Sequence, residues 1–129
     1  MNDPIASLLT QIRNALQAGH ESVTVPASRI KHEIAKKLLD GGYISKLETV
    51  GEAPKTSLLI TLKYVEGSPI VTHIKRISKP SVRIYAGKKR IPKSLSGRGI
   101  TLLTTSKGIL TDKEARAAGI GGEIICQIW

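Results

Sequence analysis

Residues 104–123 have unusually well-marked boundaries and constrain the fold more than any other part of the chain. An apolar run at 100–103 leads into them and predicts a buried strand, and the hydroxyl residues, lysine and glycine at 104–108 predict a polar loop. Thr111 and Glu114 have the three-residue spacing of a capping box, so we expect a helix to begin at Thr111.

Three glycines lie at the end of this helix or just after it. Gly119 can adopt the left-handed conformation that terminates helices. Gly121 and Gly122 permit a sharp turn or the close approach of another segment, before residues 123–129 return as a final strand. Two strand ends are therefore expected to meet at one polar, glycine-flanked place. Spacing alone also fits an ordinary loop, helix and turn, in which the glycines serve only geometry.

The positive charge lies mostly in the second half of the chain. Residues 1–65 carry eight Lys and Arg against six Asp and Glu, and residues 66–129 carry twelve against four. Ten basic residues and no acidic residue lie between Gly67 and Thr111. Because a solvated surface normally mixes both signs, this run predicts a phosphate-binding surface, with nucleic acid favoured over a membrane surface as the partner.

The pattern of apolar residues predicts an α+β fold with two small subdomains. Residues 1–65 are expected to form an N-terminal α-β-α-β-β subdomain whose last two strands, 43–50 and 56–64, flank a turn at 51–55. Turn-forming residues at 65–69 predict a short linker. Residues 66–129 are expected to form a basic, mostly β subdomain with one short helix. Its further strands are predicted at 70–77 and 81–85, with a turn or a single helical turn at 91–99. In the first subdomain, Asp3 is expected to cap the first helix.

Catalytic, metal and membrane chemistry are all disfavoured by the sequence. His20, His32 and His73 lie in unrelated contexts, and no histidine and carboxylate have a metal-ligand spacing. Cys126 is the single cysteine and its apolar neighbours predict a buried thiol. We therefore predict no enzyme, no cofactor and no metal. No apolar run approaches the roughly 20 residues that span a bilayer, so a cytoplasmic or organellar location is expected.

The segment 105–126, TSKGILTDKEARAAGIGGEIIC, resembles the signature of the S8 family of bacterial small-subunit ribosomal proteins. The resemblance extends to residues 3–14 and to Ile84 and Tyr85, so it covers the whole chain. At Thr104 many members have serine, and the hydroxyl is retained. Four aromatic residues and no Phe are too few for a large base-stacking platform or a groove that binds single strands. Hydroxyls, backbone amides and lysines suit the shallow minor groove of an RNA helix.

The resemblance implies a non-catalytic constituent of the small ribosomal subunit. Such a protein binds an irregular helix in the central domain of 16S-type ribosomal RNA directly and helps to assemble the platform of the 30S subunit. The resemblance also implies ribosomal proteins S5 and S12 as neighbours, and in some bacteria repression of the protein's own operon through its messenger RNA. A generic basic nucleic-acid-binding protein is the alternative.

The resemblance and the charge pattern together assign the RNA-binding residues. They are Thr104, Thr105, Ser106, Lys107, Gly108, Tyr85, Lys88, Lys89, Gly121, Gly122 and Glu123. Glu123 is expected to brace the loop by accepting hydrogen bonds from it, although it also fits an ordinary strand-edge glutamate. Tyr85 also fits a core position. Weaker candidates come from the first half of the chain: Arg13, Asn14, Arg29, Lys31 and Lys55.

Overall fold

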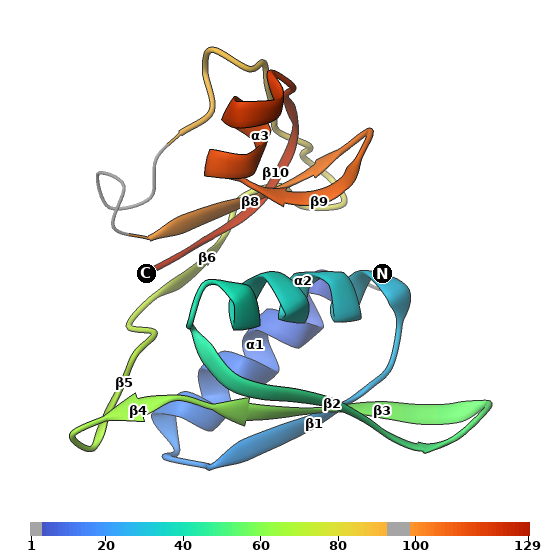
Figure 1. The fold of residues 1–129 in the computed structure, drawn as a ribbon, viewed down its shortest axis with the longest axis vertical. Coiled ribbons are helices and arrows are strands. Elements are labelled where there is room, and N and C mark those ends of the chain that lie inside the picture. Colours follow the sequence, from blue (N-terminus) through green and yellow to red (C-terminus); the bar gives the residue numbers. More distant parts are fainter. Residues whose placement is uncertain (1–3, 93–98) are drawn as a thin grey trace. The chain divides into compact units, whose positions relative to one another are not determined.

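The computed structural model describes residues 4–92 and 99–129, and the chain divides into two compact units, residues 1–71 and 72–129 (Figure 1). The predicted α+β class is confirmed, because the first unit combines helices with antiparallel strands and the second is mostly β with one short helix. The structural division falls after Val71. The functional division into subdomains 1–65 and 66–129 stays a prediction.

The first unit has two helices on one face of a three-stranded antiparallel sheet, as Figure 1 shows. Leu8, Leu9 and Ile12 form the buried stripe of α1, and alternate residues of the central strand point into the same core. The elements are α1 (Pro4–Gln17), β1 (Ser22–Pro26), α2 (Arg29–Asp40), β2 (Ile44–Glu52) and β3 (Lys55–Leu62), with the sheet order β1-β3-β2. The predicted α-β-α-β-β order is therefore confirmed.

Two turns of the first unit are tighter than the sequence predicted. Glu52 pairs with Lys55, so the β2–β3 turn is shorter than residues 51–55. The linker predicted at 65–69 is instead a hairpin of β4 (Tyr64–Val65) and β5 (Ser68–Pro69). Glu66 and Gly67 join these strands with φ values of 53° and 80°, the left-handed pair that a two-residue hairpin turn uses.

The second unit is a five-stranded antiparallel sheet with α3 (Asp112–Ala118) packed on it. Ile91, Leu103, Ala115 and Ile124 form the buried cluster between the helix and the sheet. The strands are β6 (Ile74–Arg76), β7 (Tyr85–Ala86), β8 (Ile100–Thr105), β9 (Gly108–Thr111) and β10 (Gly122–Ile128). Their order is β6-β10-β8-β9, and β7 also pairs with β10.

The strands predicted at 70–77 and 81–85 are much shorter in the structure. Both segments pair with the same edge of β10, because β8 occupies the other edge. β6 takes the C-terminal part of that edge and β7 takes the N-terminal part, so neither can extend further. The turn predicted at 91–99 lies mostly outside the described residues, and so does the N-cap predicted at Asp3.

The polar loop predicted at 104–108 is also different, because it is a β-hairpin. β8 continues through Thr105 and β9 begins at Gly108, which leaves only Ser106 and Lys107 in the turn. The helix that follows matches its prediction: the Thr111–Glu114 capping box is formed, and Gly119 ends α3 at a φ of 69°.

Candidate nucleic-acid interface

Thr105 holds the tip of the β8–β9 hairpin in one shape. Its Oγ1 accepts a hydrogen bond from the N–H of Lys107 at 3.1 Å and donates one to the carbonyl of Gly108 at 2.9 Å. Gly108 has a φ of 95°, a conformation that favours glycine, whereas neither Ser106 nor Lys107 has a positive φ. The side chains of Ser106 and Lys107 are therefore exposed on a narrow, braced tip.

A row of polar side chains crosses the sheet next to this tip. Tyr85 pairs with Glu123, and Glu123 pairs with Thr104 on its other side. Directly paired residues of neighbouring strands project from the same face, so these three side chains lie in line. The two strand ends thus meet as predicted. Tyr85 is 69% exposed, so the alternative of a core position for this residue is wrong.

Gly121 and Gly122 allow three segments to approach closely at this place. A Cβ on Gly122 would run into the carbonyl oxygen of Thr104, and one on Gly121 would run into the carbonyl oxygen of Ala86. Neither glycine has a positive φ. These positions therefore need glycine because a side chain would not fit, and not because of the backbone conformation. We call the assembled region, residues 85–89, 104–108 and 121–123, the convergent surface.

The convergent surface includes the basic turn that follows β7. Lys88 and Lys89 are exposed in a turn closed by a 2.9 Å hydrogen bond from the N–H of Arg90 to the carbonyl of Gly87. Gly87 lies against Gly121. The second-half residues predicted to bind RNA are therefore brought together by the fold, although they come from three separate parts of the sequence.

Glu123 has a different partner from the one predicted. Its Oε2 accepts a hydrogen bond and ion pair from Nη1 of Arg83 at 2.9 Å. Thr105, not Glu123, supplies the hydrogen bonds that brace the hairpin. Arg83 was missed by the sequence prediction. The sequence signal that could have identified Arg83 is its position two residues before Tyr85 in a predicted strand, because alternate residues of a strand share a face.

The weaker candidates all belong to the first unit and are dispersed over it. Arg13 and Asn14 lie on α1, and Lys55 begins β3. Arg29 is highly exposed at the start of α2 and lies 3.7 Å from Glu33. Lys31 is only 8% exposed and its Nζ donates to the carbonyl of Pro26, so it presents little surface to a ligand.

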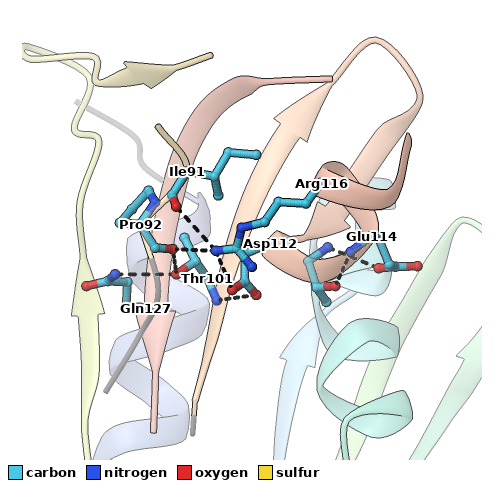
Figure 2. Close-up of polar contacts among 8 residues, drawn as sticks. Ile91, Pro92, Thr101, Asp112, Glu114, Arg116 and Gln127 are labelled. Atoms are coloured by element: carbon cyan, nitrogen blue, oxygen red, sulfur yellow. Dashed lines mark hydrogen bonds and ion pairs between the residues drawn. The ribbon is translucent and has the colours of Figure 1, made fainter. Parts of the chain in front are cut away.

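Two charged residues of the signature, Asp112 and Arg116, serve the fold (Figure 2). Asp112 is 2% exposed, and its Oδ2 lies 3.1 Å from Nη2 of Arg116 while its Oδ1 accepts from the N–H of Thr101. Arg116 also donates to the carbonyl oxygens of Ile91 and Pro92. The pair thus ties α3 to β8 and to the chain at Pro92.

The described residues offer little else that could hold a cofactor. Across 4–92 and 99–129 there is no group of three or more His, Cys, Asp or Glu able to bind a metal ion. Burial raises the pKa of the Cys126 thiol from 9.0 to about 12, against a smaller lowering by nearby Arg76. This thiol is therefore neutral and unsuited to nucleophilic chemistry near neutral pH. No helix in the described part is long and apolar enough to cross a membrane.

An exposed tip carrying a hydroxyl and a lysine, beside a basic turn, is typical of a structural nucleic-acid-binding protein. Comparison with known proteins identifies the family. The family model described as ribosomal protein S8 matches residues 3–129. The chain therefore belongs to the ribosomal protein S8 family, whose members are structural and not enzymes.

The similar proteins agree on this family over nearly their whole length. The chain is 50% identical over 129 residues to the small ribosomal subunit protein uS8 of Ruminiclostridium cellulolyticum, and 49% identical to that of Dictyoglomus turgidum. The uS8 protein of Chromohalobacter salexigens is 50% identical. Each of these alignments covers 100% of this chain and 98% of the relative. The predicted family membership is confirmed.

Proposed function

We propose that this protein is a constituent of the small ribosomal subunit that binds the central domain of its ribosomal RNA through the convergent surface. Its ligand there is an irregular RNA helix, and binding helps to assemble the platform of the subunit. The observation that carries this proposal is the braced tip of Ser106 and Lys107 beside the row of Thr104, Glu123 and Tyr85.

The chemistry of the tip suits the minor groove of RNA. The Ser106 hydroxyl can both donate and accept a hydrogen bond, and so can the 2′-hydroxyls and base edges displayed there. Lys107 adds a charge for phosphate oxygens. Because the turn contains only two residues and is held by Thr105, it enters the groove without first having to be ordered.

Ser106→Ala tests the proposal directly. The change removes one hydroxyl at an exposed position, so the free energy of unfolding should fall by no more than about 0.5 kcal/mol. Affinity for a transcript of the irregular central-domain helix should fall by about 1–3 kcal/mol, with little change for a regular RNA duplex. Both affinities are measured by titration at one fixed salt concentration.

Ser45→Ala is the matched control, because the Ser45 hydroxyl donates to the carbonyl of Leu62 within the first unit. It should leave RNA affinity unchanged. If Ser106→Ala lowers the melting temperature but not the affinity for the irregular helix, Ser106 serves the fold and the proposed contact is wrong.

The family resemblance extends the proposal beyond the RNA contact. We assign the RNA-binding role mainly to the subdomain 66–129, with ribosomal proteins S5 and S12 as neighbours and with the cytoplasmic or organellar ribosome as the location. Repression of the protein's own operon follows if its messenger RNA carries a similar helix. RNA crosslinked to the protein in cells and then sequenced would identify both ligands. Equal affinity for DNA duplexes at matched salt would instead favour a generic basic nucleic-acid-binding protein.

A further inference from the structure

Ser78 is a fully buried polar residue that the sequence did not single out. Its side chain makes two hydrogen bonds to a single residue, Ile84. The Oγ of Ser78 accepts from the N–H of Ile84 at 2.8 Å and donates to the carbonyl of Ile84 at 3.1 Å. The Ser78 side chain thus bonds both backbone groups of Ile84, the residue immediately before Tyr85.

This contact matters because β7 is only two residues long. Only Tyr85 and Ala86 pair with β10 in regular register. Beyond them, the N–H of Ile124 donates to the carbonyl of Ile84 at 2.8 Å, and the N–H of Ser78 donates to the carbonyl of Ile124 at 3.1 Å. Ser78, Ile84 and Ile124 therefore form one closed hydrogen-bonded group at the base of the turn 79–83.

The turn itself is closed by a second pair of bonds. Lys79 and Val82 exchange backbone hydrogen bonds of 2.8 and 3.0 Å, which bring the chain back toward Ser78. Arg83 and Tyr85 leave this turn on either side of Ile84. Arg83 then reaches Glu123, while Tyr85 is 69% exposed. Since the ring has little burial to orient it, its direction depends on the backbone at Ile84.

We propose that Ser78 is a positioning residue for the convergent surface: by holding both backbone groups of Ile84, it sets the direction in which Tyr85 meets RNA. This inference rests on the proposed function, because it takes RNA as the ligand of Tyr85. Ser78 itself is buried and touches no ligand.

A double-mutant cycle between Ser78 and Tyr85 tests the inference. Ser78→Ala, Tyr85→Ala and the double variant are titrated with the central-domain RNA transcript, and the folded state of each is verified by circular dichroism and urea unfolding. Tyr85→Ala should weaken binding about tenfold, and Ser78→Ala about three- to fivefold. In the Tyr85→Ala background, Ser78→Ala should weaken binding less than about 1.5-fold, because its effect passes through the ring.

Thr101→Val is the matched control for a general loss of stability. Thr101 is also fully buried in the second unit, and its hydroxyl donates to the carbonyl of Pro92 at 3.0 Å. Its effect on affinity should be the same with and without Tyr85. Ser78→Thr, which keeps the hydroxyl, should restore most of the affinity lost in Ser78→Ala. If Ser78→Ala does not fold, Ser78→Cys takes its place in the cycle, because it removes the strong acceptor while filling the space.

The outcomes separate this inference from the proposed function. Independent losses for Ser78 and Tyr85, or full affinity in Ser78→Ala, overturn the positioning role. Full affinity in Tyr85→Ala overturns it as well, while the proposed function stands as long as Ser106→Ala still weakens binding. If neither Ser106→Ala nor Tyr85→Ala weakens binding, the proposed RNA surface itself is wrong.

Discussion

Gly122 contributes to the candidate interface because it has no side chain. In the sequence it looks like Gly119, yet the two glycines have different tasks. Gly119 has a φ of 69° and open space around it, so it is needed for backbone conformation. Gly122 lacks a positive φ and faces the carbonyl of Thr104, so it is needed for close approach. At the scale of single residues, only the tertiary contacts show which glycine is needed for its backbone conformation and which for close packing.

Gly122→Ala should therefore destabilise the protein strongly. The new Cβ would overlap the backbone of Thr104, and β8 and β10 would have to move apart, at a cost of about 2 kcal/mol or more in the free energy of unfolding. Gly87→Ala is the control, because a Cβ there meets nothing within 4 Å and the φ is not positive. It should change stability by no more than about 0.5 kcal/mol. Urea unfolding measures both, and similar values would contradict the steric argument.

Cys126 gives a pH-dependent prediction at the same scale. Burial raises the pKa of its thiol from 9.0 to about 12, so above pH 9 the unfolded chain loses this proton before the folded protein does. The stabilisation is complete below pH 9 and is lost as the pH rises from 9 toward 12. Wild type should therefore lose stability over this range faster than Cys126→Ala, by up to about 1.4 kcal/mol per pH unit. Unfolding by urea at pH 8, 9 and 10 tests this, and parallel curves would contradict it.

At the scale of elements, two different sets of contacts hold the first turn of α3. The Thr111–Glu114 capping box closes its start, with bonds of 3.0 and 3.2 Å that lie at the surface. The Asp112–Arg116 pair instead ties the buried side of the helix to Thr101 and Pro92 (Figure 2). The position of α3 against the sheet thus depends on a buried charge as well as on apolar packing.

Asp112→Asn should cost more stability than Glu114→Gln. The asparagine leaves the partly buried Arg116 without its counter-charge, and we expect a loss of about 2–3 kcal/mol in the free energy of unfolding. Glu114→Gln keeps the oxygen that accepts from the N–H of Thr111, so the loss should be about 0.5 kcal/mol or less. Chemical unfolding compares the two. Equal losses would mean that Asp112 acts only as part of the helix start.

At the scale of the whole molecule, the two units differ in charge. The acid-free run between Gly67 and Thr111 supplies ten of the twenty Lys and Arg residues and lies almost wholly in the second unit. The structure exposes three of these residues in succession, Lys88, Lys89 and Arg90, next to Gly87, which lies against Gly121. An RNA-binding surface placed there would be strongly sensitive to salt.

Replacing Lys88 and Lys89 together by alanine should weaken all RNA ligands about equally. If both lysines contact phosphate, the slope of log affinity against log salt should decrease by up to about two. The control replaces Lys36 and Lys46, which are exposed in the first unit, and so removes the same net charge elsewhere. Binding titrations at four salt concentrations give both slopes. An unchanged slope in the Lys88/Lys89 variant would make that turn an ordinary solvated surface.

The sequence by itself determined the features that depend on near neighbours in the chain. The capping box at Thr111, the helix end at Gly119 and the apolar alternation of β3 are all set by residues within a few positions of each other, so local spacing predicts them well. Family membership was also readable, because residues 105–126 retain a long, specific motif.

Tertiary structure decided how distant segments share one edge. Residues 70–77 and 81–85 both have strand-like patterns, yet β10 offers them a single edge, and each keeps only the part that finds partners there. The same competition brings Tyr85 beside Glu123 and makes Ser78 the partner of Ile84. Hydrogen-bond pairing between strands depends on which groups meet in space, and local sequence preferences do not encode that choice.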